Sequence, residues 1–353
     1  MYELNKKIRE LEPYDPISGE YKIRLDANES CFSLPQSVLD KIHKSVESID
    51  FNRYPDPTAK KLIKAFADYY GLSDERVTAG NGSDELISIL MMSFLMKNDV
   101  VITVKPDFSM YSFYASVCEA ECIALQKNED LSLDADKLID AVKRNNAAML
   151  IFSNPCNPTS RGVSKDEIRR IIKSVDALVV LDEAYMDFWE ESLLDEVSSY
   201  DNLVILRTAS KAVGAAAIRL GFAVANKTLT RALRAVKSPY NVNSLTQEIG
   251  RIIYEDKAYL ADVKNKLIKL RSDLYAELKK LEGEYSQYIK VSDGNSNFVF
   301  IKTPIAKKIY DYLLSKSIAI RFMGEYIRIT SGTEAENKEL ILALRQFFKT
   351  ELV

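Results

Sequence analysis

The stretch LRTASKAVGAAAIRLG, Leu206 to Gly221, indicates both the fold and the chemistry of this 353-residue chain. It continues a short apolar run that begins after Asn202, and such a run is typical of a strand buried in a parallel sheet. Lys211 is therefore expected just beyond the C-terminal end of a strand. Ligands bind at this edge in open parallel sheets, so the sequence predicts that Lys211 lies in a ligand site.

The neighbours of Lys211 indicate what kind of ligand this is. Thr208, Ser210 and Arg219 are groups that hold a phosphate, and a lysine beside a bound phosphate can form a Schiff base if the ligand is an aldehyde. The small residues from Gly214 to Ala217 leave space for a flat molecule against the backbone. Pyridoxal phosphate is such a ligand. Taken alone, Lys211 would be interpreted as a solvated surface charge, as most lysines next to a loop are.

Strands and helices alternate along the middle of the chain. Several of the expected strands are continuously apolar, as strands covered on both faces must be, which favours a mainly parallel, doubly wound sheet. The expected strands lie at residues 76–79, 100–104, 147–152, 177–181, 203–206 and 222–225, and the helices between them at 83–96, 108–119 and 164–174.

The two ends of the chain have a different pattern. Residues 1–30 are expected to form an extended arm, followed by helices at 35–49 and 58–70. A long helical stretch at about 245–281 leads into a smaller α+β unit, with strands near 297–302, 318–322 and 326–330 and a helix at 305–316. We therefore divide the chain into an arm (1–30), a small domain (31–50 and 250–353) and a large ligand-binding domain (51–249).

The composition excludes several classes of protein. The chain has 48 basic and 51 acidic residues and no run of five or six like charges, so nucleic acid is not an expected partner. The most apolar segment, Leu86 to Met96, is too short to span a bilayer. MYELNKKIRE at the start has no apolar signal region, and four cysteines do not make a disulfide framework. His43 is the only histidine, so neither a histidine-rich metal site nor a Ser-His-Asp triad is expected. We expect a cytoplasmic protein without a membrane segment or a metal.

Other polar groups also follow predicted strands. GNGSDE opens a helix at Ser83 and Asp84, whose free N–H groups can cradle a phosphate. SNPCNPTS, Ser153 to Ser160, is a turn fixed by two prolines. Asp182 ends a buried apolar strand, and this position is costly for a carboxylate unless it meets a cation, which a pyridinium N–H would supply. Capping of the next segment is the alternative for Asp182.

These motifs resemble those of the histidinol-phosphate aminotransferase family, within the fold-type I aminotransferases. The resemblance implies an α/β fold, in which a large domain with a seven-stranded sheet joins a smaller α+β domain and an N-terminal arm. The sequence departs from the family pattern at Ser160, where a glycine is usual. It also departs at Val213 and at Ala215 to Ala217, where larger residues are usual. The matching strings are LDANE (25–29), NRYPDP (52–57), KPDFSMY (105–111), SNPCNPT (153–159), DEAY (182–185), SKA (210–212) and YIRIT (326–330).

The resemblance implies roles for the cofactor-binding residues. Lys211 would bind pyridoxal phosphate covalently and move protons. Asp182 would keep the ring nitrogen protonated, Asn157 and Tyr185 would bond the phenolic oxygen, and Phe108 would stack on the ring. The same family pattern covers the phosphate-type groups already named.

Four further residues are expected to bind substrate, and one to act across a dimer. Arg328 would grip a carboxylate through a bidentate fork, and Arg321 would help it to hold a phosphate dianion. Tyr14 resembles a tyrosine that closes over that phosphate, and Asn28 lies within LDANE. Tyr54 would reach the cofactor phosphate of the neighbouring subunit, which implies a homodimer with shared active sites. A surface position for Arg321 and a dimer contact for Tyr14 are alternatives.

The expected reaction is transfer of an amino group from L-histidinol phosphate to 2-oxoglutarate, giving imidazole-acetol phosphate and L-glutamate in histidine biosynthesis. Two alternatives use the same cofactor, namely an aromatic amino-acid aminotransferase and a threonine-phosphate decarboxylase. The cofactor motifs do not separate them, because the reaction depends on which bond at Cα stands perpendicular to the ring. A cofactor-free α/β binding protein is the alternative from another class.

Overall fold

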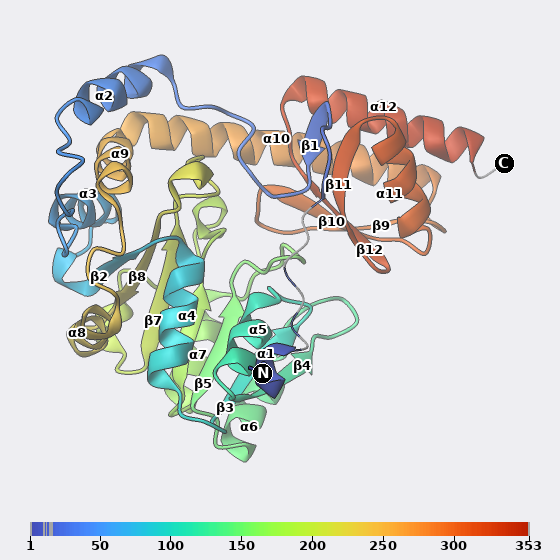
Figure 1. Ribbon diagram of the computed structural model, residues 1–353. Coiled ribbons are helices and arrows are strands. Elements are labelled where there is room, and N and C mark those ends of the chain that lie inside the picture. Colours follow the sequence, from blue (N-terminus) through green and yellow to red (C-terminus); the bar gives the residue numbers. More distant parts are fainter. Residues whose placement is uncertain (1, 10, 12, 14–16, 352–353) are drawn as a thin grey trace.

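The computed structural model describes residues 2–9, 11, 13 and 17–351, and it contains two sheets (Figure 1). The seven-stranded sheet has the order β2-β8-β7-β6-β5-β3-β4, and the five-stranded sheet has the order β1-β11-β12-β10-β9. We call the first sheet and its helices the large lobe, and the second sheet with α11 and α12 the small lobe. The large sheet consists of β2 (Val77–Gly80), β3 (Val100–Lys105), β4 (Glu121–Gln126), β5 (Met149–Ser153), β6 (Leu178–Asp182), β7 (Leu203–Thr208) and β8 (Gly221–Ala225).

The large sheet is mainly parallel, as predicted. β4, β3, β5, β6 and β7 pair in parallel, while β8 runs antiparallel to both of its neighbours, β7 and β2. β4 was not among the predicted strands. It lies at the edge of the sheet, and its residues are exposed or half-buried rather than continuously apolar.

Helices cover both faces of the large sheet. Val179 and Leu181 face one hydrophobic cluster, together with residues of α3, α6, α7 and α9. Val180 faces the other, together with residues of α4 and α5. Successive residues of β6 are therefore buried on opposite faces, which is why this strand is apolar up to its last residue, Asp182. The helices are α1 (Lys6–Arg9), α2 (Gln36–Val46), α3 (Lys60–Tyr70), α4 (Ser83–Phe94), α5 (Met110–Val117), α6 (Ala135–Arg144), α7 (Lys165–Ser174), α8 (Lys227–Val236), α9 (Ser244–Glu255), α10 (Lys257–Glu284), α11 (Ala306–Ser315) and α12 (Glu334–Thr350).

α10 joins the two lobes (Figure 1). Leu260 near its start packs into the large-lobe core, and Leu274 and Leu278 pack into the core of the small lobe. The sequence predicts one helix over about 245–281, but the structure contains two. The break falls at Asp256, whose side chain accepts a hydrogen bond from the backbone N–H of Tyr259 at 3.1 Å and so caps α10.

The small lobe is built on β1 (Ile23–Leu25), β9 (Lys290–Ser292), β10 (Phe298–Lys302), β11 (Ile318–Met323) and β12 (Tyr326–Thr330). β1 comes from the predicted arm and pairs in parallel with β11. The division of the chain at residues 30, 50 and 250 remains a prediction. It assigns α2 to the small domain, and in the structure Val38 and Ile42 of α2 pack into the large-lobe core. Within the described residues, no helix is both long and apolar enough to cross a membrane.

Candidate active site

The last residues of β2 and β7 and the first residue of β8 lie in one row of the large sheet. Gly80 of β2 lies opposite Gly221 of β8, and Gly221 lies opposite Thr208 of β7. This register brings the start of α4 against β8, where a Cβ atom added at Gly221 would lie 2.4 Å from the backbone nitrogen of Ser83. Only glycine permits this approach. The N-terminal end of α4 therefore lies beside the segment that carries Thr208.

The predicted phosphate-binding groups converge around this helix end. The Thr208 and Ser210 hydroxyl oxygens are 3.1 Å apart, and Nη1 of Arg219 donates to the Ser210 hydroxyl at 3.4 Å. Nη2 of Arg219 lies 3.7 Å from the Asp84 carboxylate. Two hydroxyls, a guanidinium and the free N–H groups of a helix start are suited to hold a phosphate. Because Asp84 sits at this rim beside Arg219, we expect it to orient the guanidinium.

Lys211 lies directly beyond this group of donors. Its Nζ donates a hydrogen bond to the backbone carbonyl of Ala27 at 3.1 Å and lies 5.9 Å from the centroid of the Tyr185 ring. The Tyr185 hydroxyl in turn accepts a hydrogen bond from Nδ2 of Asn28 at 2.8 Å. The segment after β1 therefore places Ala27 and Asn28 over the lysine and the tyrosine.

Asp182 ends β6 in the middle of the same sheet edge, and it is 5% exposed. It accepts hydrogen bonds from the Tyr111 hydroxyl at 2.8 Å and from the Ala184 backbone N–H at 3.1 Å. Burial raises the pKa of the Asp182 carboxyl to about 6 despite these two bonds. No cationic side chain among the described residues pairs with it. A buried carboxylate in this state is stabilised by an added cation, and a protonated ring nitrogen is one.

Asn157 and Arg328 meet between the lobes. Oδ1 of Asn157 accepts a hydrogen bond from Nη1 of Arg328 at 2.5 Å, and Nη2 of Arg328 donates to the Asp26 carbonyl at 2.7 Å. Arg321 lies directly opposite Arg328 in the pairing of β11 with β12, so the two side chains share one face of the small sheet. This face presents two guanidinium groups.

The remaining predicted residues lie in different places. Phe108 packs edge-on against Tyr111, with 5.6 Å between ring centroids. Tyr54 is 81% exposed and stacks on Tyr240 at 4.6 Å, so it lies on the surface of its own chain. Tyr14 lies outside the described residues. The structure thus gathers all the predicted site residues except Tyr54 and Tyr14 along the large-sheet edge and the facing small sheet.

Two features were not predicted. One is the hydrogen bond from Tyr111 to Asp182, although Tyr111 closes the string KPDFSMY. The other is a buried ion-pair network behind the site. In this network Arg207 contacts Glu183 at 3.2 Å and Asp187 at 2.8 Å. It links β7 to the segment that follows Asp182 and so supports both sides of the sheet edge.

Ser160, at the position where the family pattern has glycine, connects the proline-rich turn to the small lobe. Its backbone has φ +63°, in the left-handed region that favours glycine. Its hydroxyl lies 2.5 Å from that of Ser296, and its carbonyl accepts a hydrogen bond from the Asn295 backbone at 2.7 Å. The serine therefore offsets its backbone cost with a contact between the lobes.

A family model described as aminotransferase class I and II matches residues 20–344. The chain belongs to this family. A histidinol-phosphate aminotransferase of Clostridium novyi is 44% identical, over 96% of each chain. The crystal structure of histidinol-phosphate aminotransferase from Sinorhizobium meliloti, in complex with pyridoxal-5'-phosphate, has a TM-score of 0.89 at 23% identity, over 99% of each chain. L-threonine-O-3-phosphate decarboxylase from Porphyromonas gingivalis has the same fold, with a TM-score of 0.79 at 23% identity, over 93% of this chain and all of that one.

Membership of this family confirms the predicted family, fold class and enzyme class, and with them the predicted cofactor, pyridoxal phosphate. The alternative of a cofactor-free binding protein is thereby set aside. The residues present also fit the cofactor. The donors beside α4 suit its phosphate, and the buried Asp182 suits its ring nitrogen. The individual roles of these residues remain predictions.

Proposed function

We propose that this aminotransferase moves the amino group of L-histidinol phosphate to 2-oxoglutarate, as a step of histidine biosynthesis. The observation that supports it most is the 44% identity to a histidinol-phosphate aminotransferase over nearly the whole of both chains. The pair of arginines on the small sheet also suits it, because a phosphate dianion is better matched by two guanidinium groups than by one.

The residues of the site divide the work of holding the cofactor. Thr208, Ser210, Arg219 and the start of α4 hold its phosphate, and Asp182 keeps a proton on its ring nitrogen. Pyridoxal phosphate supplies an aldehyde that carries the amino group and a ring that withdraws electrons from the substrate. The large lobe therefore fixes the position at which chemistry takes place.

Lys211 is the group that moves protons. Its Nζ lies beside Tyr185 and the Ala27 carbonyl, and among the described residues no carboxylate is within ion-pair distance of it. As a general base, this amine would accept the proton of the substrate Cα. The Tyr185 hydroxyl and the Asn157 amide would bind the phenolic oxygen. Arg328 orients the substrate by its acidic group, so that the Cα–H bond faces Lys211.

The direct test is a comparison of amino donors with 2-oxoglutarate as acceptor. We expect L-histidinol phosphate to give the highest kcat/KM. A preference of tenfold or more for phenylalanine, about 1.4 kcal/mol in the barrier, would favour the aromatic aminotransferase instead. Release of carbon dioxide from threonine phosphate, without transfer of its amino group, would favour the decarboxylase.

We also propose that the protein is a homodimer and acts in the cytoplasm. The support for the dimer is the stacked and exposed pair Tyr54 and Tyr240, together with Phe51, which is three positions before Tyr54 in the chain and is 73% exposed. Exposed aromatic residues gathered in one place are typical of an interface. In such a dimer the Tyr54 hydroxyl would bind the cofactor phosphate of the partner.

Mixing two inactive variants tests this arrangement. If Tyr54 acts across the dimer, a heterodimer of Tyr54→Ala and Lys211→Ala chains has one site with both changes and one with neither. Activity should then recover toward about a quarter of the wild-type value on equal mixing, because half of the dimers are mixed and each has one intact site. A mixture no more active than its two components, or an active monomer by light scattering, would contradict the proposal.

A further inference from the structure

A cavity of about 920 Å³ lies between the lobes, away from Lys211 and the groups beside α4. Its large-lobe side includes Lys105, the last residue of β3, and Lys127, which follows β4. Its small-lobe side includes Lys290 of β9 and Lys302 of β10. The volume is within the range of small-molecule sites, roughly 300–1,000 Å³.

The lysines on the small-lobe side repel one another. Lys290 and Lys302 are direct partners in the antiparallel pairing of β9 with β10, so their side chains share one face of the sheet. Like charges in this position destabilise a sheet. Among the described residues, no carboxylate lies within ion-pair distance of either ammonium group, and the same holds for Lys105. The fold therefore keeps these charges together without an internal partner.

The lining also contains three carboxylates, and two of them are already engaged. Asp130 pairs with Arg161 at 3.2 Å, and Asp293 pairs with Arg271 at 3.1 Å. Glu129 is the third. Since the lysines come from both lobes and face one concave space, their fields add there and attract anions.

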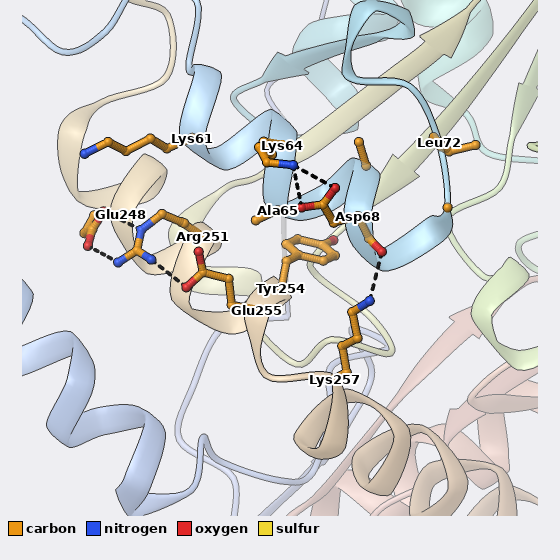
Figure 2. A pocket seen from close by; sticks show the side chains of 12 residues that line it. Lys61, Lys64, Ala65, Asp68, Leu72, Glu248, Arg251, Tyr254, Glu255 and Lys257 are labelled. Atoms are coloured by element: carbon orange, nitrogen blue, oxygen red, sulfur yellow. Dashed lines mark hydrogen bonds and ion pairs between the residues drawn. The ribbon is translucent and has the colours of Figure 1, made fainter.

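A surface pocket of about 830 Å³ between α3 and α9 provides a contrast (Figure 2). There Lys64 pairs with Asp68 at 2.9 Å, and Arg251 pairs with both Glu248 and Glu255 at 2.5 Å, as the dashed lines in Figure 2 show. Most charges of that pocket are therefore paired with one another, and only Lys61 and Lys257 have no ion-pair partner among the described residues. In the interlobe cavity, all four lysines of the lining have none among the described residues.

We propose that the interlobe cavity binds a small organic phosphate, at a site distinct from the catalytic one. Lys127 is held at the cavity by a hydrogen bond from Nζ to the Cys156 sulfur at 2.8 Å, so one cation is already positioned. Tyr275 and Tyr326 also line the cavity, and the Tyr326 ring is fixed by stacking on Phe300 at 4.7 Å. Ammonium groups bind the phosphate, and the tyrosine rings provide a flat surface for the organic part.

Titration calorimetry of the cofactor-loaded protein with inorganic pyrophosphate tests the charged part of this site. The double variant Lys290→Ala/Lys302→Ala should bind pyrophosphate about tenfold more weakly than wild type, or worse. The control is Lys143→Ala/Lys173→Ala, which removes the same charge from exposed positions on α6 and α7. It should bind within about twofold of wild type.

Equal affinity in the wild type and the Lys290→Ala/Lys302→Ala variant would overturn the proposal, because pyrophosphate would then be held elsewhere, for example at Arg321 and Arg328. An equal loss in the control would also overturn it, by showing a general effect of net charge. Lysine acetylation of the unmodified protein gives an independent location. Pyrophosphate should protect Lys105, Lys290 and Lys302 from the reagent, and unchanged acetylation at all three would contradict the proposal.

Discussion

The large-lobe side of the active site holds Lys211, Asp182 and Thr208 at the ends of strands in one sheet, whereas the small-lobe side holds Arg321 and Arg328 on the face of another. The large-lobe groups are fixed by strand register and by burial, as the row Gly80, Gly221 and Thr208 shows. The small-lobe groups reach the site because contacts between the lobes, including those made by α10 and the segment after β1, bring the two sheets together.

This difference separates two properties of the enzyme. Any change on the large-lobe side should affect every substrate, because it acts on the cofactor. A change on the small-lobe side should affect substrates unequally, since it acts on the acidic group by which they differ. The following variants test that separation.

Lys211→Ala should have the largest effect. The variant loses both the covalent attachment point and the proton-transferring amine, so turnover should fall by several orders of magnitude with every amino donor. The groups beside α4 remain, so cofactor should still bind without a covalent link. Borohydride treatment of the wild type, followed by peptide mass mapping, should place the reduced cofactor on Lys211. An adduct on a different lysine would refute the assignment.

Asp182→Asn should change how the stability of the cofactor-free protein depends on pH. Burial raises the pKa of Asp182 from about 3.8 to about 6 in the folded protein. Between these values the folded state binds more protons than the unfolded state, so the free energy of unfolding falls as pH rises. Above pH 6 this loss reaches about 3 kcal/mol for a shift of about two units. The asparagine variant has no such loss.

The measurement is the unfolding midpoint of the cofactor-free wild type and variant between pH 4 and pH 7. The stability of Asp182→Asn relative to the wild type should increase as pH rises through this window. Asp201→Asn, which removes a carboxyl at an exposed position, is the control, and its stability should not rise relative to the wild type across this window. Glu183 would not serve as a control, because burial also raises the pKa of its carboxyl, to about 7. A constant offset between wild type and Asp182→Asn would show that burial of the charge is not the cause.

The large-lobe side could be predicted from sequence because each of its residues follows a strand with a clear apolar pattern. Asp182 directly after LVVL, and Thr208 two positions after LVIL, are examples. The edge strand β4 could not, since one half-exposed strand lacks that pattern. The break at Asp256 was also missed, because the apolar spacing of α9 continues into α10 and only the cap marks the boundary.

Contacts between distant segments were beyond the reach of the sequence pattern. The bond from Tyr111 to Asp182 joins residues 71 positions apart, and the network of Arg207 with Glu183 depends on how two strands are paired. The two arginines of the small sheet were predicted individually. That they lie directly opposite each other follows only from the register of β11 with β12.

Arg321→Ala should have the smallest effect and should act selectively. If Arg321 adds its charge to Arg328 for a phosphate dianion, kcat/KM for L-histidinol phosphate should fall about tenfold or more, since one charged hydrogen bond contributes roughly 1.5–3 kcal/mol. The half-reaction with glutamate, whose carboxylate needs one guanidinium fork, should change less. Arg328→Lys should weaken both half-reactions, because lysine keeps the charge but loses the fork. Arg144→Ala, on the exposed face of α6, serves as the control with unchanged kinetics. Equal losses for both half-reactions in Arg321→Ala would mean that this residue supports the fold of the small sheet rather than the choice of substrate. Arg328 alone would then have to account for substrate choice on the small-lobe side of the site.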